Sequence, residues 1–185
     1  MFLTLVHMTL GRRNVALEKR GEADFETLNT GAVDLLRQKV DNRLAELYRE
    51  NPHDTRLICA IRHALLSPGK RFRPLITLLA YAEHGGEIEE AIDAACAVEM
   101  VHAASLIMDD LPSMDDARLR RGRLATHVVF GEGTGMLAAV SLLNEAYRVI
   151  ANGEAGDAAQ KLRAVAHLTK AVGPDGLAGG QERDI

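Results

Sequence analysis

The sequence has few of the features that mark secreted, zinc-binding or nucleic-acid-binding proteins. Its 185 residues include only two cysteines, Cys59 and Cys96, and the net charge is −4. Neither cysteine has a second cysteine or histidine at zinc spacing, and both lie in apolar helical stretches. They are therefore predicted to be buried thiols in a reducing compartment. An acidic balance gives no electrostatic support for a nucleic-acid partner.

Targeting signals and strand patterns are also lacking. The opening MFLTLVHMTL is apolar, but it has no basic start and is too short to span a bilayer. We therefore expect a cytoplasmic protein without a transmembrane segment, in which residues 1–24 form a poorly defined N-terminal extension. No internal repeat and no useful length of strand alternation is visible.

Apolar residues instead recur three and four positions apart, which indicates amphipathic helices. Residues 25–185 are thus predicted to form a single all-α domain with a sizeable core. Residues 122–135 are expected to be a loop. Helices are predicted at 28–48, 56–66, 75–81, 91–108, 136–150 and 158–172.

The most unusual segment is an acidic cluster that runs directly into a basic one. Four aspartates occur within eight residues, and four arginines follow within the next seven: Asp109, Asp110, Asp115 and Asp116, then Arg118, Arg120, Arg121 and Arg123. Such crowded like charges repel unless a partner neutralises them. Mg²⁺ suits the carboxylates and a phosphate suits the arginines, so the pattern predicts a metal and phosphate site. The alternative is a solvated helix end whose acids pair with the arginines.

The helix that leads into this cluster supports the first interpretation. It is apolar almost all round, except for one stripe of polar residues spaced three, three and four apart: Glu99, His102, Ser105 and Asp109. A helix of this kind is normally buried, so the stripe is predicted to face an internal polar cavity. Pro112 should break the helix, and the resulting bulge could turn both aspartate pairs toward one site.

Two shorter motifs carry weaker signals. In GKRFRP, Lys70 and Arg73 lie three apart and could clamp one anion from a helical turn, although a solvated basic turn is an equal alternative. Near the end of the sequence, Gln181 and Asp184 also lie three apart and could face the cavity. His102 alone would more often be a satisfied core histidine than a ligand-binding one.

Together these motifs resemble those of the trans-polyprenyl diphosphate synthases. HAASLIMDDLPSMDDARLRRG is similar to the family's first aspartate-rich motif, GKRFRP to its GKRxRP signature, and GGQERD to its GGQxxD helix. The resemblance is strongest to bacterial geranylgeranyl diphosphate synthases of the carotenoid type. It covers about residues 28–185, but the family's Lys-Thr pair and second aspartate-rich motif do not appear. The expected fold is an isoprenoid-synthase-type helical bundle that is incomplete at its C-terminus.

The resemblance also implies a role for each motif. A bound Mg²⁺ would assist ionisation of an allylic diphosphate, and the double bond of isopentenyl diphosphate would attack the resulting cation. The implied catalytic residues are Asp109, Asp110, Asp115 and Arg120. The implied metal ligands are Asp109, Asp110 and Asp115, and Asp116 only assists them. The implied substrate-binding residues are Lys70, Arg73, His102 and Arg121 for isopentenyl diphosphate, Arg120 for the allylic diphosphate, and Gln181 and Asp184 near the metal-bound diphosphate.

Product length and partners follow from the same resemblance. Ala104 and Ser105 are small and lie about one turn before Asp109, which favours extension of farnesyl diphosphate to a C20 product. A homodimer is expected, or pairing with a full-length synthase. Two alternative functions are a non-catalytic binding or regulatory subunit of a prenyl synthase, and a terpene cyclase. The cyclase needs no second diphosphate site, so Lys70 and Arg73 argue against it.

Overall fold

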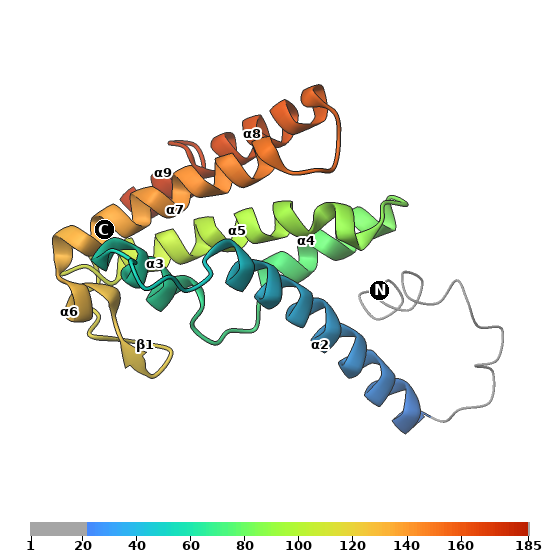
Figure 1. Cartoon of the computed structure of the whole chain (residues 1–185), viewed down its shortest axis with the longest axis horizontal. Coiled ribbons are helices and arrows are strands. Elements are labelled where there is room, and N and C mark those ends of the chain that lie inside the picture. The colour runs from blue at the N-terminus through green and yellow to red at the C-terminus, as the bar shows by residue number, and fades with distance from the viewer. Residues whose placement is uncertain (1–21, 185) are drawn as a thin grey trace.

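The computed structural model describes residues 22–184, with side chains from residue 31 onward. Of the expected extension 1–24, residues 1–21 lie outside the described part, and residues 22–24 begin the first helix. The fold is all-α, as predicted, with one very short hairpin (Figure 1). The elements are α2 (Glu22–Leu47), α3 (Arg56–Leu65), α4 (Phe72–Glu83), α5 (Ile88–Asp109), β1 (Leu119–Arg120), β2 (Arg123–Leu124), α6 (Thr126–Phe130), α7 (Glu132–Asn152), α8 (Ala158–Val172) and α9 (Leu177–Glu182).

Helix α5 is the centre of the bundle. It packs against α2, α3, α4 and α7, while α8 lies along the outer side of α7 and leads into α9 (Figure 1). Twelve of its residues are buried, among them Ala95, Met100 and Ala104. By length and composition this helix could cross a membrane, yet most of its apolar window is buried inside the protein, as expected of a core helix. The site residues on α5 are therefore held on a buried helix at the centre of the bundle.

Several predicted boundaries need correction. Helices α4 and α5 begin three residues earlier than expected, at Phe72 and Ile88. Pro74 is accommodated in α4 because the first turn of a helix leaves its N–H groups without intrahelical partners.

The predicted loop at 122–135 is wrong. It contains β2, α6 and the start of α7. Strands of two residues are too short to show alternation. Gly131, at a φ of 81°, separates α6 from α7 by a single residue, so a helix junction resembles a loop in the sequence.

The cysteine prediction is half right. Cys96 is fully buried on α5, whereas Cys59 is exposed on α3. The inner face of α3 is formed by Ala60, Ile61 and Leu65, and Cys59 points away from it. Apolar neighbours in the sequence suggested burial there, but the position on the helical turn decides it.

Candidate functional site

The site begins where α5 ends. Asp109 is its last residue, and the chain turns before and through Pro112, as the sequence predicts. In this turn the backbone N–H of Asp115 donates to the carbonyl of Asp109 at 2.9 Å, and that of Asp116 to the carbonyl of Leu111 at 3.1 Å. The turn brings Asp115 back beside Asp109. Asp116 is exposed, with a positive φ of 49°.

Negative charge accumulates around Asp109. Burial raises the pKa of Asp109, and the charge of Asp115 adds to this effect, followed by those of Asp110 and Asp184, while Arg120 opposes it. Gln181 Nε2 donates to Asp109 Oδ1, so α9 returns to the end of α5 across 72 residues of sequence. Gln181 thus contacts the aspartate cluster directly, and Asp184 lies near enough for its charge to act on Asp109. Their role beside a metal-bound diphosphate stays a prediction.

Asp110 is in a different environment from Asp109. Its side chain is buried and accepts from Arg120 Nε at 2.9 Å. This hydrogen bond is the main reason why the pKa of Arg120 is raised, and the charges of Asp109 and Asp115 contribute further. Arg120 thus stands among the carboxylates with its charge already compensated by Asp110. A metal-ligand role for Asp110 or Asp116 stays a prediction.

The carboxylates are suitable ligands for a divalent cation, although they are not arranged as a complete metal-binding group. In the part of the chain that the structure describes, no three His, Cys, Asp or Glu side chains are gathered as a metal-binding group. Asp109 and Asp115 nevertheless offer adjacent carboxylates whose mutual repulsion a cation would relieve. Mg²⁺ commonly takes only one or two carboxylates and completes its shell with water and phosphate oxygens. The residues present fit such an ion.

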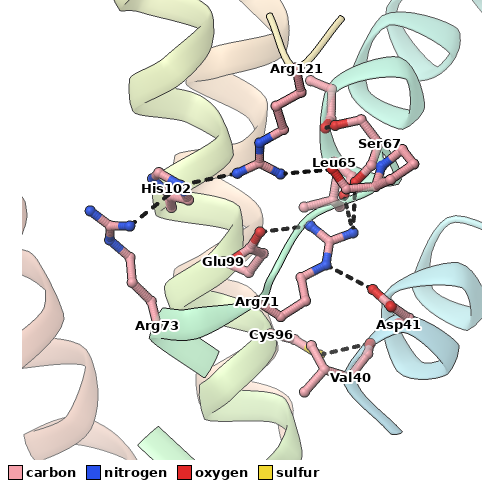
Figure 2. A network of polar contacts seen from close by, with 12 residues as sticks. Val40, Asp41, Leu65, Ser67, Arg71, Arg73, Cys96, Glu99, His102 and Arg121 are labelled. Atoms are coloured by element: carbon pink, nitrogen blue, oxygen red, sulfur yellow. Dashed lines mark hydrogen bonds and ion pairs between the residues drawn. The ribbon is translucent and has the colours of Figure 1, made fainter. Parts of the chain in front are cut away.

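Two turns earlier on α5, three basic side chains converge (Figure 2). Arg73 Nη1 lies 3.5 Å and Arg121 Nη2 lies 3.4 Å from His102 Nε2. Burial, reinforced by the charges of Arg73 and Arg121, lowers the pKa of His102 to about 4. The ring is neutral at pH 7, and Nε2 accepts from the guanidiniums because arginine can only donate. Two cations thus stand side by side around a neutral acceptor, and Lys70 is exposed nearby in sequence.

Arg121 is placed by the hairpin and by a glycine. It forms the turn between β1 and β2 with Gly122, at φ values of 52° and 75°, which a tight hairpin turn requires. Its Nη1 donates to the carbonyl of Pro68 at 3.3 Å. A Cβ on Gly69 would collide with this guanidinium, so the close approach depends on a glycine at that position. The hairpin itself is tied to α3, because His63 Nε2 donates to the carbonyl of Leu124 at 2.8 Å.

The sequence did not reveal the network beside these cations. Arg71, in the middle of the basic run, is buried at the start of α4 and pairs with Asp41 and with Glu99 (Figure 2). The spacing of α5 places Glu99 in the polar stripe, but nothing in a basic run distinguishes the arginine that turns inward. Its partners lie 30 and 28 residues away, beyond any local pattern.

The polar stripe of α5 faces a small cavity with only some of its residues. A cavity of about 30 Å³, enough for about two water molecules, is lined by Glu99 and His102 together with Arg120 and Arg121. Ser105 is buried and donates to the carbonyl of His102 at 2.9 Å, and Ala104 is fully buried. Neither lines this cavity, so their role in product length stays a prediction.

Comparisons with known proteins agree with the motifs. The model of the polyprenyl synthetase family matches residues 54–185. A geranylgeranyl diphosphate synthase from Pantoea ananas is 44% identical over 160 residues, which are 85% of this chain and 53% of the relative. The chain spans about half the length of the curated relatives it matches.

Solved structures are similar over a comparable region. An FPP/GFPP synthase from Zymomonas mobilis matches with a TM-score of 0.79 and 32% identity, over 84% of this chain and 56% of that structure. A geranyltransferase from Legionella pneumophila matches with a TM-score of 0.81 and 31% identity, over 86% and 56%. The family model covers well over half of the sequence, and the all-α fold agrees with it. The chain therefore belongs to the polyprenyl synthetase family.

Proposed function

We propose that the protein is a prenyltransferase that condenses isopentenyl diphosphate with an allylic diphosphate, extending farnesyl to geranylgeranyl diphosphate. The observation that carries this proposal is the placement of two charge clusters of opposite sign along one helix. The cations surround His102, and the carboxylates surround Asp109. Seven residues of helix separate the two by about 10 Å. Two diphosphates held at these clusters would lie close enough for their prenyl groups to meet.

The cation cluster would hold isopentenyl diphosphate. Arg73 and Arg121 present guanidiniums whose donors match phosphate oxygens, and exposed Lys70 adds a third positive charge. Neutral His102 keeps the two guanidiniums in place without adding a third fixed charge between them. When the anion binds, the arginines would exchange their weak contacts to His102 for charge-assisted bonds to the diphosphate.

The carboxylate cluster would hold the allylic diphosphate through Mg²⁺. Asp109 and Asp115 are the best placed to bind the ion, with Asp110, Asp116 and Asp184 as further candidates, and Gln181 orients Asp109. When bound, the metal supplies electrostatic stabilisation for the departing diphosphate. Arg120 lies among these carboxylates and would add a cation beside the same diphosphate.

Product length and setting form the finer part of the proposal. The small side chains at Ala104 and Ser105 favour a C20 product, as the family resemblance implies, and the apolar residues of α5 would keep water from the reacting carbons. Ala104→Tyr should therefore shorten the product, and an unchanged product would contradict that position for the pocket. We further propose that the protein works in the cytoplasm as a homodimer or together with a second prenyl synthase subunit.

The decisive experiment is mass-spectrometric product analysis of the purified protein with Mg²⁺, isopentenyl diphosphate and farnesyl diphosphate. We expect a C20 diphosphate that is lost in Asp109→Ala and in Arg73→Ala. Arg118→Ala is the matched control, because Arg118 is an exposed arginine that follows the aspartate cluster and has no assigned role. Absence of product would favour a non-catalytic subunit, and a cyclic product from farnesyl diphosphate alone would favour a terpene cyclase.

A further inference from the structure

Arg71 is the buried centre of a polar network between four helices (Figure 2). Its Nε donates to Asp41 Oδ1 at 2.7 Å, and its Nη1 donates to Glu99 Oε1 at 2.6 Å. Its Nη2 donates to the carbonyls of Leu65 and Ser67, both at 3.1 Å. The side chain is only 4% exposed. The guanidinium of Arg71 therefore connects the start of α4 with three other helices: α2, the end of α3, and α5.

The backbone of Arg71 is unusual as well. Its φ of 48° and ψ of 36° are left-handed, a conformation that is costly for any residue with a Cβ. It caps α4, and its carbonyl accepts the N–H of Leu75 at 3.0 Å in the first bond of the helix. A glycine would adopt this conformation more easily but would lack the guanidinium. The four side-chain bonds hold the strained residue in place.

Both proposed diphosphate ligands of the GKRFRP motif are next to this anchor. Lys70 precedes Arg71 directly, and Arg73 follows it in the first turn of α4. Both are exposed, while Arg71 between them is buried. The inward turn of Arg71 thus fixes the direction in which its two neighbours leave the protein surface, and places Arg73 within reach of His102.

Arg71 also forms an ion pair with Glu99. This glutamate is 2% exposed and stands one helical turn before His102 on the same face of α5. Without a partner, a buried negative charge at that position would repel a diphosphate bound at the cation cluster. The ion pair with Arg71 compensates it and leaves the charges of Arg73 and Arg121 available.

From these observations we propose that Arg71 is a positioning residue of the diphosphate site, which sets the direction of Lys70 and Arg73 and compensates Glu99 without touching substrate. The inference rests on the proposed function, since it takes those two residues as diphosphate ligands. Arginine is required because its planar fork reaches four acceptors at once, which the single ammonium of lysine does not match.

The test uses the whole protein and inorganic pyrophosphate without metal, measured by titration calorimetry well below each variant's unfolding temperature. Arg71→Lys keeps the charge but loses the fork, and Arg71→Met/Glu99→Met removes the pair without leaving a buried charge. We expect both to bind pyrophosphate roughly tenfold more weakly than the wild type. The matched control is Arg43→Met/Asp93→Met, which removes another pair between α2 and α5, at 2.8 Å and remote from the motif. Its affinity should stay within about twofold of wild type.

A second measurement separates positioning from simple loss of stability. If Arg73 leaves its place in Arg71→Lys, the pKa of His102, followed by NMR of the ring proton, should rise toward its ordinary value although the charge at position 71 is unchanged. If Arg71→Lys keeps the wild-type affinity and the pKa of His102 is unchanged, this inference is overturned while the proposed diphosphate site stands. The same holds if the Arg43→Met/Asp93→Met control loses as much affinity as the Arg71 variants. A wild-type protein that binds no pyrophosphate would overturn the proposed diphosphate site and this inference with it.

Discussion

The protonation of His102 offers a direct test of the electrostatics of the cation cluster. Burial and the nearby arginines lower the pKa of His102 from 6.5 to about 4. The unfolded chain, in which the ring has its ordinary pKa, therefore takes up a proton more readily than the native protein. The contribution of His102 to stability is complete above pH 6.5 and is lost as the pH falls from there toward 4.

The magnitude follows from the two pKa values. At a pH of about 5, linkage gives an upper limit of about 2 kcal/mol for the free energy of unfolding lost relative to neutral pH. The ring is only half-buried, so solvent screening should reduce this loss to about 1 kcal/mol. The effect is opposite in sign to that of a carboxyl group whose pKa is raised, such as Asp109, which favours the native state as the pH falls.

The comparison that isolates this effect is between wild type and His102→Gln. Glutamine keeps a neutral acceptor for Arg73 and Arg121 but cannot become charged. Urea unfolding at pH values of about 7.5 and 5 should show the wild type losing ~1 kcal/mol more than the variant. Arg73→Met should raise the pKa of His102 and reduce the difference. Equal losses in wild type and His102→Gln would refute the argument that the cluster keeps the ring neutral.

Three further predictions concern the neighbouring residues. Asp109→Asn should raise the unfolding free energy of the metal-free protein by about 0.5 kcal/mol after allowance for solvent screening, because it removes one of the crowded charges. The same variant should no longer be stabilised by Mg²⁺ in thermal unfolding. Gly69→Ala should displace Arg121 and weaken pyrophosphate binding measured by calorimetry, while the unfolding free energy falls by less than about 1 kcal/mol, since a flexible side chain can move aside. A thiol reagent should modify Cys59 rapidly in the native protein, whereas Cys96 should react only after unfolding, since burial raises its pKa to about 12; two fast thiols in the native protein would contradict the packing of α5.

The features that the sequence predicted are those encoded by local spacing. The 3.6-residue period of α5 places His102 and Asp109 on one stripe, and Pro112 predicts the end of the helix. The structure agrees, and the turn after α5 brings Asp115 beside Asp109. The contact of Gln181 with Asp109 was not predicted, because helical spacing cannot bring together residues 72 positions apart and the resemblance to a family implies only that Gln181 lies near a metal-bound diphosphate.

The features that the sequence did not predict depend on tertiary partners. Arg71 and Arg73 belong to the same basic run, but only the fold decides that Arg71 turns inward to Glu99 and Arg73 outward to His102. In the same way, Asp109 and Asp110 look equivalent in sequence. Burial against Arg120 makes Asp110 one half of an ion pair and leaves Asp109 among other carboxylates.

The polar stripe of α5 shows how burial sorts chemically similar groups into structural and binding roles. Glu99 is compensated by Arg71, and Ser105 is satisfied by the backbone of its own helix. His102 is held neutral between two cations, and Asp109 keeps a charge that its neighbours oppose. Glu99 and Ser105 thus have partners within the protein. Arg73 and Arg121 face the neutral ring of His102, and Asp109 stands beside Asp115, so a ligand of opposite charge would be attracted to each cluster. These charges agree with the proposed function, in which a diphosphate binds the cations around His102 and a divalent cation binds the carboxylates around Asp109.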